Sequence, residues 1–181
     1  DPVQIALGLE AGAHAFYLIT AVLGADLEEC VDAVTAMGTE CIVEVHTLNE
    51  LEHALSLGVS MICVNNWDRV TGKLYPDQAL NLCSALPKEI ITLATGGIKT
   101  KEQCFELSDA GYDGVILGRA LAECKDINKF IGDIKKRKGV PRKFLGWGLR
   151  AEDVDWDDLV EMTPENTDSD FSDATADVGA V

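Results

Sequence analysis

Apolar runs of strand length alternate along the chain with segments whose apolar residues recur at helical spacing. The runs cover residues 15–23, 41–47, 60–66, 90–97 and 112–118. They are almost uniformly apolar rather than alternating, which is typical of parallel strands that are covered on both faces. The pattern therefore predicts five buried parallel strands.

The segments between these runs predict helices. Thr47 with Glu50 and Thr100 with Gln103 have the spacing of capping boxes, which open helices. The six predicted helices cover residues 2–12, 27–38, 47–58, 77–87, 100–111 and 125–138. The last has an apolar face that we expect to point inward, formed by Ile127, Phe130, Ile131 and Ile134. Strands that alternate with helices in this way predict a parallel barrel or a doubly wound sheet.

Polar residues at the ends of the predicted strands favour the barrel. Glu44, Asn65, Thr95 and Arg119 all stand at or near the carboxyl end of a strand. A (β/α)8 barrel gathers its active site at that end. We therefore expect these four side chains to share one site.

Two of the strand ends are rich in glycine. Thr95-Gly96-Gly97 and Gly118-Arg119 end consecutive strands, which lie side by side in a barrel. Glycine lets backbone N–H groups approach an anion, so the pair predicts a phosphate site. The alternative is that these glycines only form tight turns from strand to helix.

Composition narrows the class of protein. With 181 residues and 47% hydrophobic residues, the chain predicts about one soluble globular domain. No apolar run approaches the roughly 20 residues of a membrane span, and no signal peptide opens the sequence. A formal net charge of −16 argues against nucleic acid as a partner. Six cysteines without a C-x-x-C pair predict buried thiols in a reducing compartment rather than disulfides or metal ligands.

Several segments in series resemble a known family. VEVHTLNELEHALSLG, VNNWD, ATGGIKT and GVILGRAL are similar to indole-3-glycerol-phosphate synthase from just after its third strand to its end. The resemblance covers about residues 1–138. It implies the (β/α)8 TIM-barrel lineage with the C-terminal five strands present. It also implies a decarboxylating ring closure in tryptophan biosynthesis, a sugar-phosphate-type substrate and no cofactor.

The resemblance assigns roles to individual residues. Glu44 in VEVH matches the general-base glutamate, and Asn65 matches a substrate-positioning asparagine. Gly97 and Gly118 match backbone phosphate-binding positions, with Thr95, Gly96 and Arg119 beside them. A general base of this kind needs a raised pKa, which burial of Glu44 between two valines would provide.

Each of these roles has a plainer alternative. Glu44 could be a structural carboxylate paired with a lysine, and Asn65 with Asn66 could form only a strand-end turn. His46 and His53 are expected to be scaffold or surface residues. No third ligand is spaced for a metal site, so we predict none.

Some positions depart from the family pattern. Trp67 stands where the family usually has arginine, and Thr95 with Gly96 replaces a glutamate and a serine. Arg119 replaces a small or acidic residue. The first three strands, with the catalytic lysines and a glutamate, are missing from the sequence. We therefore expect this chain to be inactive in ring closure as it stands.

A second segment, residues 139–181, follows the barrel-like part. A basic run, residues 135–144, spans its start, and residues 151–181 hold eleven acidic residues but no lysine or arginine. Apolar residues scattered among them predict a docking or partly disordered tail. These residues include Trp156, Leu159, Val160, Met162 and Phe171, and Trp147 lies shortly before them.

This tail, with the altered site, supports a second hypothesis: a structural or interaction subunit of a larger assembly. Its protein partners would bind residues 147–171 and the open edges of the incomplete barrel. Another phosphate-binding barrel enzyme is a third, weaker alternative. The expected compartment is the cytoplasm or, by resemblance to phototroph relatives, the plastid stroma.

Overall fold

The described part of the chain, residues 1–136 of a computed structural model, is built on one parallel sheet. The strands follow one another in sequence order, and each pairs in parallel with the next. They are β1 (Ala15–Ile19), β2 (Glu40–Val45), β3 (Met61–Asn65), β4 (Ile91–Thr95) and β5 (Gly114–Ile116). This order confirms the predicted five parallel strands of a TIM-barrel-like α/β fold. The predicted tail, 139–181, lies outside the described residues, as does its proposed docking stretch 147–171.

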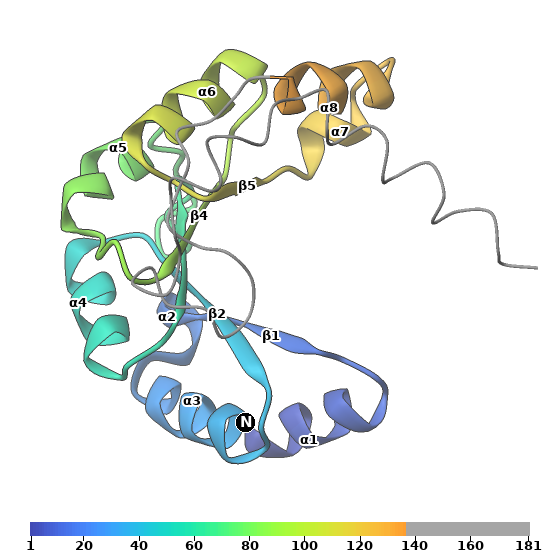
Figure 1. Cartoon of the computed structure of the whole chain (residues 1–181). Coiled ribbons are helices and arrows are strands. Elements are labelled where there is room, and N and C mark those ends of the chain that lie inside the picture. Colours follow the sequence, from blue (N-terminus) through green and yellow to red (C-terminus); the bar gives the residue numbers. More distant parts are fainter. Residues whose placement is uncertain (137–181) are drawn as a thin grey trace, which may run out of the picture. The chain divides into compact units, whose positions relative to one another are not determined.

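Helices connect the strands, and Figure 1 shows α3, α4, α5 and α6 along one side of the sheet. Both predicted capping boxes are present, at Thr47 and at Thr100. No helix among residues 1–136 is long and apolar enough to cross a membrane. The helices are α1 (Pro2–Glu10), α2 (Thr20–Leu23), α3 (Leu27–Ala36), α4 (Leu48–Ser56), α5 (Gln78–Leu82), α6 (Lys101–Ala110), α7 (Arg119–Ala122) and α8 (Ile127–Lys135). Two 3-10 turns, η1 (Gly24–Asp26) and η2 (Cys83–Ala85), extend α2 and α5.

Two predictions of local structure are wrong. The apolar run 15–23 is not one strand, because β1 ends at Ile19 and α2 begins at Thr20. An apolar run alone does not separate a strand from a helical turn, since both can bury such residues. In α8, Ile127 is exposed rather than inward, while Ile134 packs against the core.

The two faces of the sheet differ. Val43, Ile62, Val64 and Ala94 point to the helices and form the core with helical residues such as Leu51. Because side chains alternate along a strand, the intervening residues share the opposite face. The register places Glu44 of β2 beside Cys63 of β3 there, and Asn65 beside Thr95. The polar residues of the candidate site therefore lie together on the face away from the helices.

That face is only partly covered. Its apolar residues include Tyr17 and Ile116, which are 41% and 38% exposed and belong to the edge strands β1 and β5. All six cysteines are free; Cys83 and Cys124 are half-buried and the other four are buried. Within residues 1–136, β1 and β5 each have one edge without a partner strand.

Candidate functional site

The predicted base, Glu44, is a buried carboxylate near the carboxyl end of β2. Its side chain is 2% exposed and accepts hydrogen bonds from two neighbours. The Tyr17 hydroxyl donates to Oε2 over 2.7 Å. The Arg69 guanidinium donates from Nε to Oε1 over 2.7 Å and from its terminal nitrogen to Oε2 over 3.0 Å. Glu44 is therefore held in a two-pronged ion pair.

This pairing reverses the expected pKa shift. Burial by itself raises the pKa of Glu44, as predicted for a general base, but the hydrogen bonds from Arg69, Asn65 and Tyr17 outweigh it. The pKa of Glu44 is therefore lowered from its ordinary value. The expectation of a raised pKa was wrong because sequence neighbours set only the burial, whereas the opposing charge comes from a loop 25 residues away. The partner is an arginine rather than the lysine of the structural alternative.

The adjacent asparagines connect this site to the next strand end. Asn65 accepts a hydrogen bond from the backbone N–H of Trp67 over 2.9 Å, which is the local turn contact of the plainer alternative. Its side chain also contributes to lowering the pKa of Glu44. Asn66 donates to the carbonyl of Gly96 and accepts from the backbone N–H of Ala79. The two residues thus join β3, the Gly96 turn and the start of α5.

His46 serves the scaffold. Its Nδ1 lies 2.7 Å from the carbonyl oxygen of Asn65, and its ring lies 5.4 Å from that of Tyr75. The side chain is buried, while His53 lies in the last turn of α4. Within residues 1–136, no group of three or more His, Cys, Asp or Glu side chains could hold a metal ion.

The loop after β3, residues 67–74, lies between the two strand-end sites. Trp67 and Leu74 form an antiparallel bridge, and Asp68 accepts hydrogen bonds from the backbone of Val70 and Thr71. Arg69 projects from this loop to Glu44. The same loop therefore carries one residue of the carboxylate site and two residues of the neighbouring pocket.

The glycines at the two strand ends have different structural reasons. Gly96 and Gly97 have φ values of 88° and 67°, in the region that favours glycine. A Cβ on Gly96 would lie 2.3 Å from Oδ1 of Asn65, and one on Gly97 would lie 2.7 Å from Leu74. A Cβ on Gly118 would meet no atom within 4 Å. The tight-turn alternative thus holds for Gly96 and Gly97, but the fold itself does not require glycine at 118.

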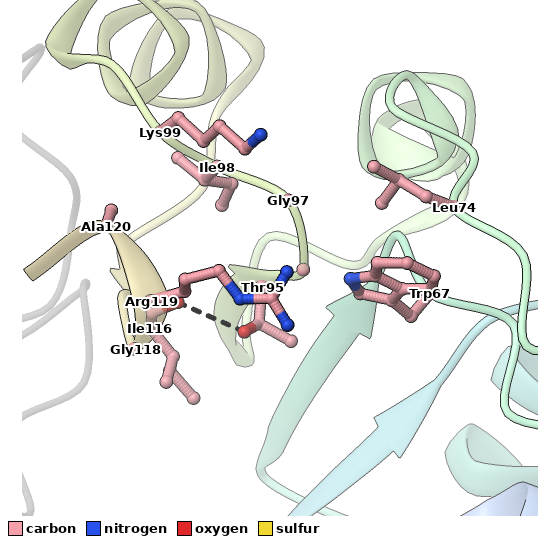
Figure 2. Close-up of a pocket in the computed structure, with 11 residues that line it drawn as sticks. Trp67, Leu74, Thr95, Gly97, Ile98, Lys99, Ile116, Gly118, Arg119 and Ala120 are labelled. Carbon is pink, nitrogen blue, oxygen red and sulfur yellow. Dashed lines mark hydrogen bonds between the residues drawn. The ribbon is translucent and has the colours of Figure 1, made fainter. Parts of the chain in front are cut away.

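A pocket lies between these strand ends, with a volume of about 240 Å³. It brings together the predicted phosphate-site residues Thr95, Gly96, Gly97, Gly118 and Arg119. Figure 2 shows the Arg119 guanidinium and the nitrogen of the Trp67 ring facing each other below the Gly97 turn. Lys99 also lines the pocket. None of the ion pairs found among residues 1–136 involves Arg119 or Lys99. The Arg119 guanidinium points to the Gly97 turn, whereas the Lys99 side chain points away from Arg119 (Figure 2).

Sequence reasoning missed three contributors to these sites: Arg69, Tyr17 and Lys99. One signal was available for Arg69, since VNNWDR places an arginine two residues after the position where Trp67 replaces one. Tyr17 gave no signal, because an aromatic residue in an apolar strand is usually a core residue.

Comparisons with known proteins agree on one family. The family model described as indole-3-glycerol phosphate synthase matches residues 1–134. A protein of that name from Carboxydothermus hydrogenoformans is 36% identical over 131 residues, which are 71% of this chain and 50% of the relative. Another, from Bacillus mycoides, is 36% identical over 137 residues, 75% of this chain and 54% of the relative. The chain thus spans about half the length of these relatives.

Solved structures agree on the fold. The 3-hexulose-6-phosphate synthase of Salmonella typhimurium aligns with a TM-score of 0.61 at 17% identity, covering 74% of this chain and 65% of that one. The native KDPGal structure aligns with a TM-score of 0.56 at 21% identity, covering 75% and 63%. At such identities the similarity concerns the fold alone.

Proposed function

We propose a function from one premise: the chain belongs to the indole-3-glycerol phosphate synthase family. In this proposal the chain supplies the phosphate-binding part of a synthase-type barrel and takes the phosphate of a sugar-phosphate-type substrate. The reaction served is the decarboxylating ring closure of tryptophan biosynthesis. The carrying observation is a pocket lined by two glycine-rich strand ends and by two cations, Arg119 and Lys99, that belong to no ion pair found among residues 1–136.

Three properties of the pocket support an anionic ligand. Arg119 and Lys99 supply positive charge, and a guanidinium can bind phosphate through paired hydrogen bonds. Gly118 leaves open space where a Cβ would otherwise stand, so a ligand can approach the backbone there. The half-exposed Trp67 and the open side of the pocket leave room for the rest of the substrate.

Ring closure itself needs more than these residues. Glu44 is held as an ion by Arg69, whereas a general base near neutrality needs a higher pKa. The family resemblance places the lysine acid on a strand that this sequence does not include. In this proposal the 181 residues tested alone bind phosphate, and Glu44 does not act as a general base while it is paired with Arg69.

One observation favours a second candidate function, an interaction subunit of a larger assembly. β1 and β5 are edge strands with half-exposed apolar side chains, and such edges pair readily with further strands. In this reading the barrel is a docking platform and residues 147–171 add a second contact. The altered positions Trp67 and Arg119 are compatible with a retired active site.

The free cysteines bear on the cellular compartment that we propose for either function. Four buried and two half-buried free thiols suit a reducing compartment, such as the cytoplasm or the plastid stroma. Cell fractionation that locates the native protein tests this part of the proposal.

Calorimetric titration of the full chain with glycerol 3-phosphate tests the binding proposal. We expect saturable binding that glycerol does not reproduce, because the phosphate provides the contacts in the pocket. Arg119→Ala should weaken it, whereas Lys101→Ala, which removes a cation paired with Asp133, should not. Equal heats with glycerol and its phosphate would contradict the proposal.

Gentle purification of the native protein separates the two functions. Recovery as a longer chain that closes the ring would support the synthase. Recovery of this chain in fixed ratio with other subunits, without ring-closing activity, would support the interaction subunit.

A further inference from the structure

The Glu44–Arg69 pair combines a buried acceptor with a partly exposed donor. The Glu44 side chain is 2% exposed and that of Arg69 is 46% exposed. Both carboxylate oxygens are engaged, Oε1 by Nε and Oε2 by a terminal nitrogen of Arg69. Such a fork fixes the orientation of the carboxylate as well as its charge.

Most of the acceptor capacity of Glu44 is occupied. An ionised carboxylate offers about four lone-pair sites. Arg69 takes two of these sites and the Tyr17 hydroxyl takes one. Arg69 therefore supplies two of the three hydrogen bonds that hold the carboxylate.

Arg69 is the donor that can withdraw most readily. Tyr17 and Asn65 belong to the strands β1 and β3, whereas Arg69 stands on the loop 67–74. That loop is nevertheless ordered locally, by the Trp67–Leu74 bridge and by Asp68, whose carboxylate accepts from Val70 N and Thr71 N. The guanidinium is thus presented to Glu44 by a defined turn rather than by an irregular chain.

We propose that Arg69 is a positioning residue for Glu44, and that it keeps this carboxylate ionised and oriented. Glu44 then becomes a proton acceptor only when Arg69 leaves. The inference rests on the proposed synthase-type site, because the role of Glu44 comes from it.

The groups that face Glu44 determine what a test should show. They are Arg69 from the loop, Tyr17 from β1, and Cys63 and Asn65 from β3. Burial raises the pKa of the Cys63 thiol to about 12, and burial also raises that of Tyr17, so both stay neutral through the range in which carboxylates titrate. Arg69 is therefore the charged neighbour whose removal should let burial raise the pKa of Glu44.

The experiment is a 13C NMR titration of the glutamate carboxyl carbons in the full chain between about pH 2.5 and 9, bracketing the ordinary glutamate pKa. Wild type should show Glu44 titrating below the ordinary range. In Arg69→Ala its midpoint should rise by at least about one pH unit and pass above that range, because burial is no longer offset. Lys73→Ala, which removes an exposed cation from the same loop, should leave the midpoint unchanged.

Arg69→Lys keeps the charge but loses the fork, so its midpoint should lie between those of wild type and Arg69→Ala. If Arg69→Ala does not fold, the comparison of the Glu44 midpoint in wild type and Arg69→Lys tests the proposal. Midpoints that are equal in wild type and both Arg69 variants would overturn the proposal. Inorganic phosphate added to the same samples should still bind at Gly97 and Arg119, so a failure of the phosphate site is seen separately.

Discussion

The two sites at the strand ends, the Glu44 site and the pocket of Arg119, treat charge in opposite ways. Glu44 is buried and already matched by a guanidinium, a hydroxyl and an amide. The pocket is open and positive, with two cations that no carboxylate of residues 1–136 neutralises. A matched buried charge is preorganised without a ligand, whereas an unmatched exposed one gains from binding an anion. The Glu44 site is therefore preorganised by its own contacts, whereas the pocket of Arg119 is suited to bind an anion.

The largest effect is expected from a substitution at Gly96, where the two sites meet. Gly96→Ala should lower the free energy of unfolding by about 3 kcal/mol, from left-handed backbone strain plus overpacking against Asn65. Gly12→Ala, which has φ 96° but no atom within 4 Å, isolates the strain and should cost about 1 kcal/mol. Chemical denaturation measures both. Equal losses would mean that Asn65 is not held against the Gly96 turn.

The second effect concerns the open pocket alone. Arg119→Ala should weaken phosphate binding about tenfold, since a charge-assisted hydrogen bond contributes roughly 1.5–3 kcal/mol and exposure reduces it. Stability should change by less than about 0.5 kcal/mol, because the side chain is exposed and outside the core. Isothermal titration and thermal melts measure the two quantities. A large loss of stability with unchanged affinity would assign Arg119 to the fold.

A substitution at Gly118 should change phosphate affinity without changing stability, and by less than the substitution at Arg119. Gly118→Ala should keep its stability, as no atom lies within 4 Å of the added Cβ, but should weaken phosphate binding several-fold by occupying the space in the pocket. The same titration and denaturation experiments apply. If affinity does not change, the phosphate binds away from this strand end.

The smallest effect sharpens the matched side of the comparison. The folded pKa of Glu44 is lowered, so its ion pair stabilises the fold fully above the unfolded pKa of about 4.3 and is lost as pH falls through the folded pKa. Wild type should therefore lose about 1 kcal/mol more than Glu44→Gln on acidification from pH 6 to pH 3. Denaturation curves at both pH values measure the difference. Parallel losses in the two proteins would show that the pair contributes no net stability.

The sequence predicted the fold well because the relevant signals are local. Uniform apolar runs located all five strands, and the Thr47 and Thr100 capping boxes located two helix starts. The prediction failed at residues 20–23, where an apolar turn of helix follows a strand, and at Ile127, whose helix face depends on what packs against it.

The site was only half predictable. Positions such as Glu44 and Gly97 could be placed because parallel strands share one carboxyl end. The charge state of Glu44 could not, since it depends on Arg69, which reaches it from 25 residues away through a structured loop. The sequence also could not tell whether a glycine is required by the fold. Gly96 and Gly118 both follow a strand, but a Cβ would meet close atoms only at Gly96.

The most direct test of the central claim is an amide NMR titration of the full chain with inorganic phosphate. We predict saturable shifts at Gly96, Gly97, Gly118 and Arg119, the backbone groups of the open pocket, with Glu44 and Arg69 unmoved. Shifts that do not saturate, or that centre on Glu44 and Arg69, would contradict the division of this site into a matched carboxylate and an open anion pocket.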